Sequence, residues 1–348
     1  MTRPVLGRLT RNAEAALLFE SFFVAVVASF LGIRWFLAST GYPRIGSNGL
    51  HIAHMLWGGL LMLLALMLLF AFLDRSVQHL AAVIAGLGFG TFIDEIGKFV
   101  TADNNYFYRP TIALIYCLFV VAFLVARTLI GQGRLSETEA LANAFDVLGG
   151  TPDGPIEPDD RTRIERLLEL ANPKAPLVVF AKRYIAALPQ AAERTTLVGT
   201  VRRRLADGYE VVMANPWAER VLSVGVVAYA AVAVLAVGLV AAETPAGGVT
   251  ETSAVATIGQ VASTIIGAAL VGRGVLSLRN SRTAAYHWFM RGLVVWILIT
   301  QIFVFYSSQL AGLGGLVVDL VAYGSLRFAI TREIVAGRRP SEAASRQA

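Results

Sequence analysis

The stretch GLGFGTFIDEIGKFVTADNNYFYRP, residues 86–110, decides how the whole chain is interpreted. It begins as a glycine-rich apolar segment and runs directly into Asp94, Glu95 and Lys98 before an amide- and tyrosine-rich loop. In a soluble protein such a segment would be a helix that reaches the surface. In a lipid environment the same three charges are costly and need a specific reason to be there.

Composition indicates lipid as the solvent. Of the 348 residues, 56% are hydrophobic and only 16% are charged, with a mean hydropathy of +0.62. A soluble domain carries about 25% charged residues. The net charge of +6 does not indicate nucleic-acid binding, because the basic residues gather at the ends of apolar runs. The single cysteine, Cys117, excludes an intrachain disulfide and a cysteine metal cluster.

Apolar runs of the length needed to cross a bilayer recur along the chain. About 20 apolar residues span a hydrocarbon core of about 30 Å. We expect an all-α polytopic integral membrane protein with about eight transmembrane helices. The predicted spans lie near residues 15–37, 51–73, 79–100, 110–130, 219–241, 253–275, 285–307 and 311–331. The first run lacks an obvious cleavage site, so we interpret it as an uncleaved span rather than a signal peptide.

Arginines alternate between the loops and predict an orientation. Alternate loops are arginine-rich, while "ETPAGGVTETS" and "SSQLAGLGG" contain no basic residue. By the positive-inside rule we expect both termini to lie in the cytoplasm, and we expect the protein to lie in the plasma membrane. The strong preference for arginine over lysine is typical of a GC-rich bacterial genome. The arginines that mark the cytoplasmic side outside 131–217 are Arg3, Arg8, Arg11, Arg75, Arg279, Arg282, Arg332, Arg338 and Arg339.

A polar insertion at 131–217 divides the chain. Ser136 and Glu139 have the spacing of a capping box, and the following sequence predicts short amphipathic helices. We therefore expect a helical cytoplasmic insertion that is a structural linker or docks a cytoplasmic protein partner. The expected domains are a four-helix half (1–130), the insertion (131–217), a second four-helix half (218–335) and a disordered tail (336–348).

The opening stretch predicts a polar cluster near the outer membrane face. Gly86 and Gly90 allow close approach of another helix, and Asp94 lies on the same helical face. His51 and His54, three residues apart, start the second span at the same level. With Asp94 they form a plausible three-ligand site for zinc or another divalent metal.

The loop that follows the third span adds further candidates to this level. The outer-loop residues are Asp103, Asn104, Tyr106, Tyr108 and Arg109, and Arg34 and Arg44 flank them from the first outer loop.

A plainer interpretation of the same residues is an ion pair between Asp94 and Lys98, with the histidines at the interface. Lys98 is the only lysine in the membrane region. The charge of a buried lysine can be lost, unlike that of arginine, which favours a functional role for Lys98. Both interpretations stay open.

A second acid lies deeper in the membrane. Asp319, in GGLVVDLVAYG, has no charged neighbour one helical turn away. It must find a partner on another helix or stay protonated. Gln301 and Gln260 lie at depths where either could be that partner. These residues are candidates for an ion or proton pathway.

Three classes of function fit this pattern. The first is transport of an ion or small solute along a pathway formed by Asp94, Glu95, Lys98 and Asp319. The second is a metal-dependent membrane enzyme with Glu95 as general acid or base and a lipid or envelope precursor as substrate. The third is a non-catalytic sensor or scaffold. We favour transport narrowly, because two separated membrane acids suit a pathway better than one compact site.

Overall fold

The computed structural model describes residues 9–41, 53–100, 110–131, 135–150, 154–189, 215–243 and 251–345, with a few isolated positions between these ranges. The protein is 86% helical, and no strand occurs within these ranges. Seven helical segments of the described chain are long and apolar enough to cross a membrane. They are Ala15–Thr40, His54–Ala71, Arg75–Asp94, Thr111–Ile130, Arg220–Leu239, Ala254–Ser277 and Arg282–Ile330. The protein is therefore an α-helical membrane protein.

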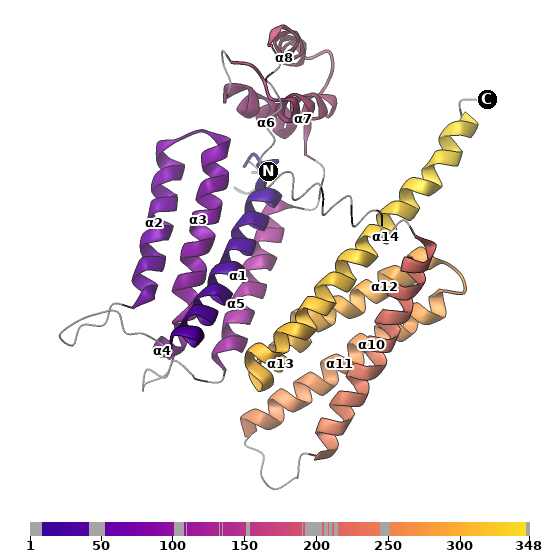
Figure 1. Ribbon diagram of the computed structural model, residues 1–348. Helices are drawn as coiled ribbons and strands as arrows, with labels where there is room; N and C mark the ends of the chain where they lie inside the picture. Colours follow the sequence, from indigo (N-terminus) through magenta and orange to yellow (C-terminus); the bar gives the residue numbers. More distant parts are fainter. Residues whose placement is uncertain are drawn as a thin grey trace, which may run out of the picture. The chain divides into compact units, whose positions relative to one another are not determined.

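The seventh segment contains both of the last two predicted spans. It comprises α12 (Arg282–Val295), the π-helical turn η2 (Trp296–Thr300), α13 (Gln301–Ser308), the short 3₁₀ turn η3 (Gln309–Gly312) and the start of α14 (Leu313–Ser345). Gln309 has a positive φ of 47°, a conformation that breaks the helix. Beyond this break α14 packs against α12, so the chain folds back on itself (Figure 1).

The chain forms two compact units. The first consists of Met1–Tyr106 and Val121–Thr195, and the second of Phe107–Val120 and Thr196–Ala348. Helix α5 (Thr111–Ile130) contributes its first half to the second unit and its second half to the first unit.

In the first unit, α3 (Arg75–Asp94) packs against both α1 (Ala15–Thr40) and α2 (His54–Ala71) (Figure 1). Glycines make both contacts close. A Cβ on Gly90 would lie 2.5 Å from the Val26 carbonyl of α1, and one on Gly88 would lie 2.7 Å from the Gly58 carbonyl of α2. The helix backbones therefore meet directly, as the G-x-x-x-G spacing predicted.

The prediction of one continuous third span over 79–100 is wrong at its end. Helix α3 stops at Asp94, Glu95 has a non-helical φ/ψ of −86° and 3°, and a short helix α4 (Ile96–Val100) follows. The two neighbouring acids thus stand at a junction between helices rather than within one helix.

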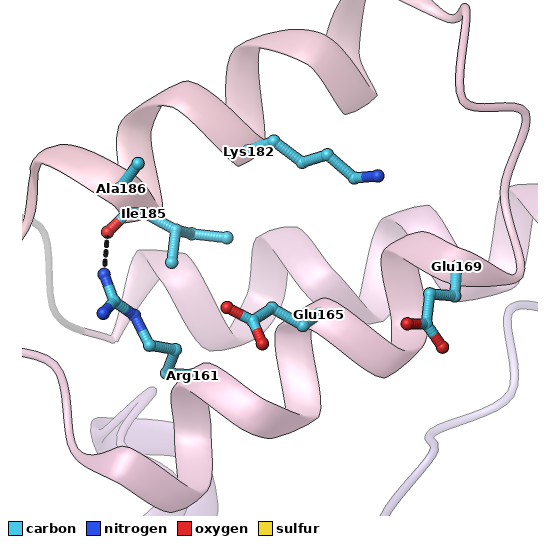
Figure 2. Close-up of a pocket in the computed structure, with 6 residues that line it drawn as sticks. All are labelled: Arg161, Glu165, Glu169, Lys182, Ile185 and Ala186. Atoms are coloured by element: carbon cyan, nitrogen blue, oxygen red, sulfur yellow. Dashed lines mark hydrogen bonds between the residues drawn. The ribbon is translucent and has the colours of Figure 1, made fainter.

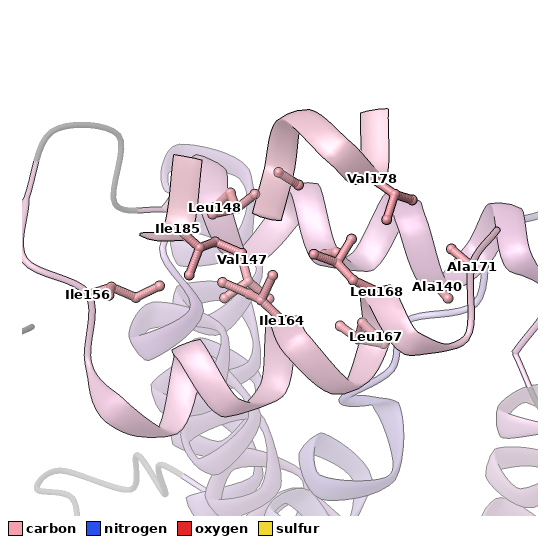
Figure 3. Packing of buried hydrophobic residues seen from close by; sticks show 12 residues of the cluster. Ala140, Val147, Leu148, Ile156, Ile164, Leu167, Leu168, Ala171, Val178 and Ile185 are labelled. Carbon is pink, nitrogen blue, oxygen red and sulfur yellow. The ribbon is translucent and has the colours of Figure 1, made fainter. Parts of the chain in front are cut away.

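A three-helix domain follows in the first unit, made of α6 (Glu137–Gly149), α7 (Pro158–Glu169) and α8 (Pro176–Ala187). Aliphatic side chains from the three helices converge on one core (Figure 3). The capping box predicted at Ser136 and Glu139 is confirmed: each side chain accepts a hydrogen bond from the backbone N–H of the other. The three helices are 12 or 13 residues long, shorter than the about 20 residues needed to cross a hydrocarbon core.

Charged contacts tie the three-helix domain to the bundle of the first unit. Glu14, buried just before α1, pairs with Arg163 of α7 and with Arg75 and His79 of α3. The distances to Arg75 Nη2 and His79 Nε2 are 3.3 Å and 3.6 Å. Burial lowers the pKa of the Arg163 guanidinium. One carboxylate thereby joins two membrane helices to α7.

A second contact connects the N-terminal segment with α6. Arg11 donates from Nε and Nη2 to the two carboxylate oxygens of Glu139, at 2.8 Å and 2.9 Å. This bidentate bond, together with the backbone N–H of Ser136, lowers the pKa of Glu139 far below its usual range. Asn143 adds two hydrogen bonds, from Ala13 N–H and to the Arg11 carbonyl. The three-helix domain is therefore held at several points.

The second unit is built from α10 (Pro216–Glu243), α11 (Glu251–Ser277) and the α12–α14 segment. Its core gathers Phe289, Leu293 and Trp296 against Val226 and Val271, with other apolar residues around them. Gly292 lets α12 approach α11, since a Cβ there would lie 2.7 Å from the Gly267 carbonyl. This packing fixes the π-helical turn beside α10 and α11.

Candidate functional site

The first candidate site lies where α3 ends. Asp94 is fully buried, and both of its carboxylate oxygens are engaged. Arg34 Nε of α1 donates to Oδ1 at 2.5 Å, and His54 Nε2 of α2 lies 3.1 Å from Oδ2. The face that Gly86 and Gly90 open toward α1 thus delivers Asp94 to Arg34, and the histidine approaches from the other side.

Glu95 is also fully buried, and both of its oxygens are engaged as well. Lys98 donates to Oε1, and the backbone N–H of Met55 donates to Oε2 at 3.1 Å. His54 Nδ1 lies 3.5 Å from Oε1. The imidazole therefore stands between the two acids with one ring nitrogen toward each.

These five side chains form a charge-balanced cluster. Two carboxylates face two basic side chains, Arg34 and Lys98, with His54 between them. The plainer prediction paired Asp94 with Lys98; in the structure Arg34 pairs with Asp94 and Lys98 pairs with Glu95. A buried ion network is stable when every charged group in it has a partner, as Asp94 and Glu95 have here.

The predicted metal set is described only in part. His54 and Asp94 meet, but His51 lies outside the described residues, as do Asp103, Asn104, Tyr106 and Arg109 of the predicted outer loop. Tyr108 is described and is exposed. Within the described part of the chain, no group of three or more His, Cys, Asp or Glu side chains is arranged to hold a metal ion.

The second candidate site is a partly open cavity of about 360 Å³ in the second unit. Helices α10, α11, α13 and α14 and the turns η2 and η3 all contribute to its wall. The three polar residues predicted for this depth, Asp319, Gln301 and Gln260, all line it. The structure therefore brings together residues that the sequence could only place at similar depth.

Asp319 is the charged residue of this cavity. It is 2% exposed and lines the cavity together with Tyr229 of α10. Its Oδ1 atom has no hydrogen-bond partner among the described residues. A buried carboxylate oxygen without a donor is costly, so Asp319 must take a proton or a cationic or hydrogen-bonding ligand.

The π-helical turn also forms part of the cavity wall. Thr300, which ends the turn and is 8% exposed, has a buried Oγ1 that finds no hydrogen-bond partner in the described part of the chain. Gln301 Nε2 is already used, since it donates to the Gly312 carbonyl at 2.8 Å. Gln301 thus stabilises the η3 turn rather than bonding Asp319. π-Helical turns are frequent at functional sites because they redirect side chains.

Sequence reasoning missed Tyr229, Trp296 and Thr300. Tyr229 stands in an otherwise apolar Ala- and Val-rich helix, and this isolated hydroxyl was a usable signal. Its ring meets Trp296 edge to face, with centroids 5.4 Å apart. No pattern in the sequence predicts the π-helical turn that places Trp296 and Thr300 on the cavity wall.

The three-helix domain has a larger surface cavity of about 530 Å³ between α7 and α8 (Figure 2). Its charged side chains are balanced, with Arg161 and Lys182 against Glu165 and Glu169. Arg161 donates to the Ile185 carbonyl near the end of α8, at 2.5 Å, which gives that arginine a structural role. The balance of charge gives this cavity no preference for a charged ligand.

Comparison of the chain with protein-family models, curated proteins and solved structures found no match.

Proposed function

We propose that this protein transports an ion or small solute across a lipid bilayer, and that the cavity of the second unit is its cargo site. The observation that carries the proposal is the buried Asp319 carboxylate, whose Oδ1 faces no donor among the described residues. Uptake of a proton or a cation relieves this cost and its release restores it. A carboxylate that is easily loaded and unloaded is what a transport pathway requires.

The contrast with the other acids supports this assignment. All four carboxylate oxygens of Asp94 and Glu95 already accept from neighbouring side chains or backbone. Asp94 and Asp319 also belong to different compact units. We therefore assign cargo binding to Asp319 and a stabilising role to the Asp94–Glu95 cluster.

We further propose eight crossings, with the break at Gln309 separating the last two. The arginine-rich loops then place both termini and the three-helix domain in the cytoplasm of a cell with a plasma membrane of bacterial type. Labelling of single cysteines in a Cys117→Ala background tests this arrangement. Cysteines at Ser136 and at Gln309 should react from opposite sides of the membrane.

Flux through reconstituted protein tests the function. Proteoliposomes with an internal pH-sensitive dye report proton movement under an imposed potential, and planar bilayers report currents of other ions. Asp319→Asn should abolish the wild-type flux, whereas Glu20→Gln, at an exposed acid of α1, should leave it unchanged. Wild-type flux in the Asp319→Asn variant, or no flux in any assay, would remove the proposal.

A further inference from the structure

We propose that the Asp319 cavity binds a small organic ammonium ion that also carries a hydroxyl or carbonyl oxygen. The inference rests on the proposed function only in taking this ion as the cargo. The size of the cavity and the chemistry of its wall support this ligand class.

The cavity is too large for a proton or a bare metal ion alone. Its volume of about 360 Å³ is near the lower end of the range for small-molecule sites, about 300–1,000 Å³. A hard cation such as Ca²⁺ takes about six to eight oxygen ligands at close range. The described wall offers a single carboxylate; neutral polar groups come from Gln260, Thr264, Thr300, Gln301 and Ser308, and the rest is alanine, valine, glycine and two aromatic rings. An organic molecule suits both the size and the apolar surface.

The carboxylate on the wall favours a positive charge on that molecule. Asp319 Oδ1 needs a hydrogen-bond donor or a cation, and no basic side chain lines the cavity among the described residues. An ammonium group supplies the charge and, where it carries hydrogen, the donor as well. Burying a carboxylate in such surroundings is tolerable when an opposite charge is present.

Aromatic rings add affinity for the same group. Tyr229 and Trp296 both line the cavity and meet at 79° with centroids 5.4 Å apart. Tryptophan and tyrosine rings attract ammonium ions through their quadrupole. A carboxylate beside two aromatic rings is therefore a recognition site for organic ammonium ions.

Thr300 specifies a second feature of the ligand. Its buried Oγ1 has no partner among the described residues, although it can donate or accept a hydrogen bond. Gln260 brings an amide to the same wall. These groups fit a ligand oxygen, which tetramethylammonium lacks and choline has.

Binding to the full chain in detergent tests the inference. The probes are choline, tetramethylammonium and 3,3-dimethylbutan-1-ol, the neutral carbon isostere of choline, each measured by calorimetry. Choline should bind at least tenfold more tightly than the isostere. Asp319→Asn should weaken choline binding at least tenfold.

Two further variants separate contact with the ligand from damage to the fold. Thr300→Val should weaken the binding of choline more than the binding of tetramethylammonium, without lowering the melting temperature. Gly315→Ala should also weaken choline binding, because Gly315 lines the cavity and the added methyl takes up space there. The new Cβ would lie 3.6 Å from the Tyr229 hydroxyl, an ordinary contact that does not strain the fold. Gly314→Ala is the matched control, since a Cβ there meets nothing within 4 Å.

Each result of these experiments supports or overturns the inference. Failure of both ammonium ions to bind, or equal binding of choline and its isostere, would overturn the inference, as would unchanged choline binding in Asp319→Asn. Asp319-dependent flux without ammonium binding would do the same while leaving transport standing. Ammonium binding that depends on Asp319 without any flux would support the site and reject transport.

Discussion

Asp319 and Thr300, on α14 and the π-helical turn, line one cavity, and each has a buried oxygen without a hydrogen-bond partner in the described part of the chain. Two such atoms in one cavity lower the stability of the ligand-free protein. Each unsatisfied buried group costs about 1–3 kcal/mol. Natural proteins retain such groups mainly where function uses them.

Removing the Thr300 hydroxyl should therefore stabilise the protein. We expect Thr300→Val to raise the melting temperature in detergent, by up to the equivalent of about 1–3 kcal/mol. Ser263→Ala is the control, because the Ser263 hydroxyl is buried but donates to the Gly259 carbonyl at 2.7 Å. A lower melting temperature for Thr300→Val than for Ser263→Ala would show that the threonine hydroxyl has a partner.

The contact between α2 and α3 should tolerate no added methyl at Gly58. A Cβ there would lie 2.6 Å from both the Gly88 carbonyl and the Phe92 backbone nitrogen. Since these are backbone atoms, the helices must separate, and we expect Gly58→Ala to lower the melting temperature clearly. Gly59→Ala, whose Cβ meets nothing within 4 Å, should be neutral or slightly stabilising. Equal effects of the two variants would contradict the close approach.

The Asp94–Glu95 cluster should be sensitive to loss of one charge and less so to loss of a pair. Arg34→Met leaves the buried Asp94 carboxylate without its strongest partner, and breaking a buried ion pair costs about 3–5 kcal/mol. Adding Asp94→Leu to that variant should recover part of the loss, as a thermal melt would show. A double variant less stable than Arg34→Met would mean that Asp94 is needed for more than balancing Arg34.

The attachment of α6 to the N-terminal segment should weaken in acid. The pKa of Glu139 is lowered by Arg11, so the stabilisation is complete above the ordinary value of 4.5 and is lost as the pH falls below it. Hydrogen exchange should show α6 amides losing protection on acidification in the wild type. In Glu139→Gln protection should be lower at neutral pH and should change little with acid. Glu137→Gln, at an exposed acid in the same first turn, should behave like the wild type.

The sequence predicts the helices of this protein well because apolar length and glycine spacing are local signals. The close contact at Gly86 and Gly90 and the capping box at Ser136 both follow from such signals. The partners of the charged residues did not follow, since they depend on which helices meet. Arg34 pairs with Asp94 and Lys98 pairs with Glu95 beside the break in α3, and no residue pattern marks that break.

The residues of the cavity were also predicted only in part from the sequence. Asp319, Gln301 and Gln260 were found because polar residues in apolar helices are conspicuous, while Thr300 was not, since threonine is common in membrane helices. Its importance arises from the π-helical turn and from the absence of a hydrogen-bond partner for its Oγ1 among the described residues. Gln301, although conspicuous, is used by the Gly312 carbonyl.

The most direct measurement of the central claim is flux in one reconstitution series of wild type, Asp319→Asn and Asp319→Glu, at matched protein density. We expect wild-type flux that disappears in Asp319→Asn and persists in reduced form in Asp319→Glu, because the second variant keeps a carboxylate in the cavity. Equal flux in the wild type and in Asp319→Asn would contradict the account.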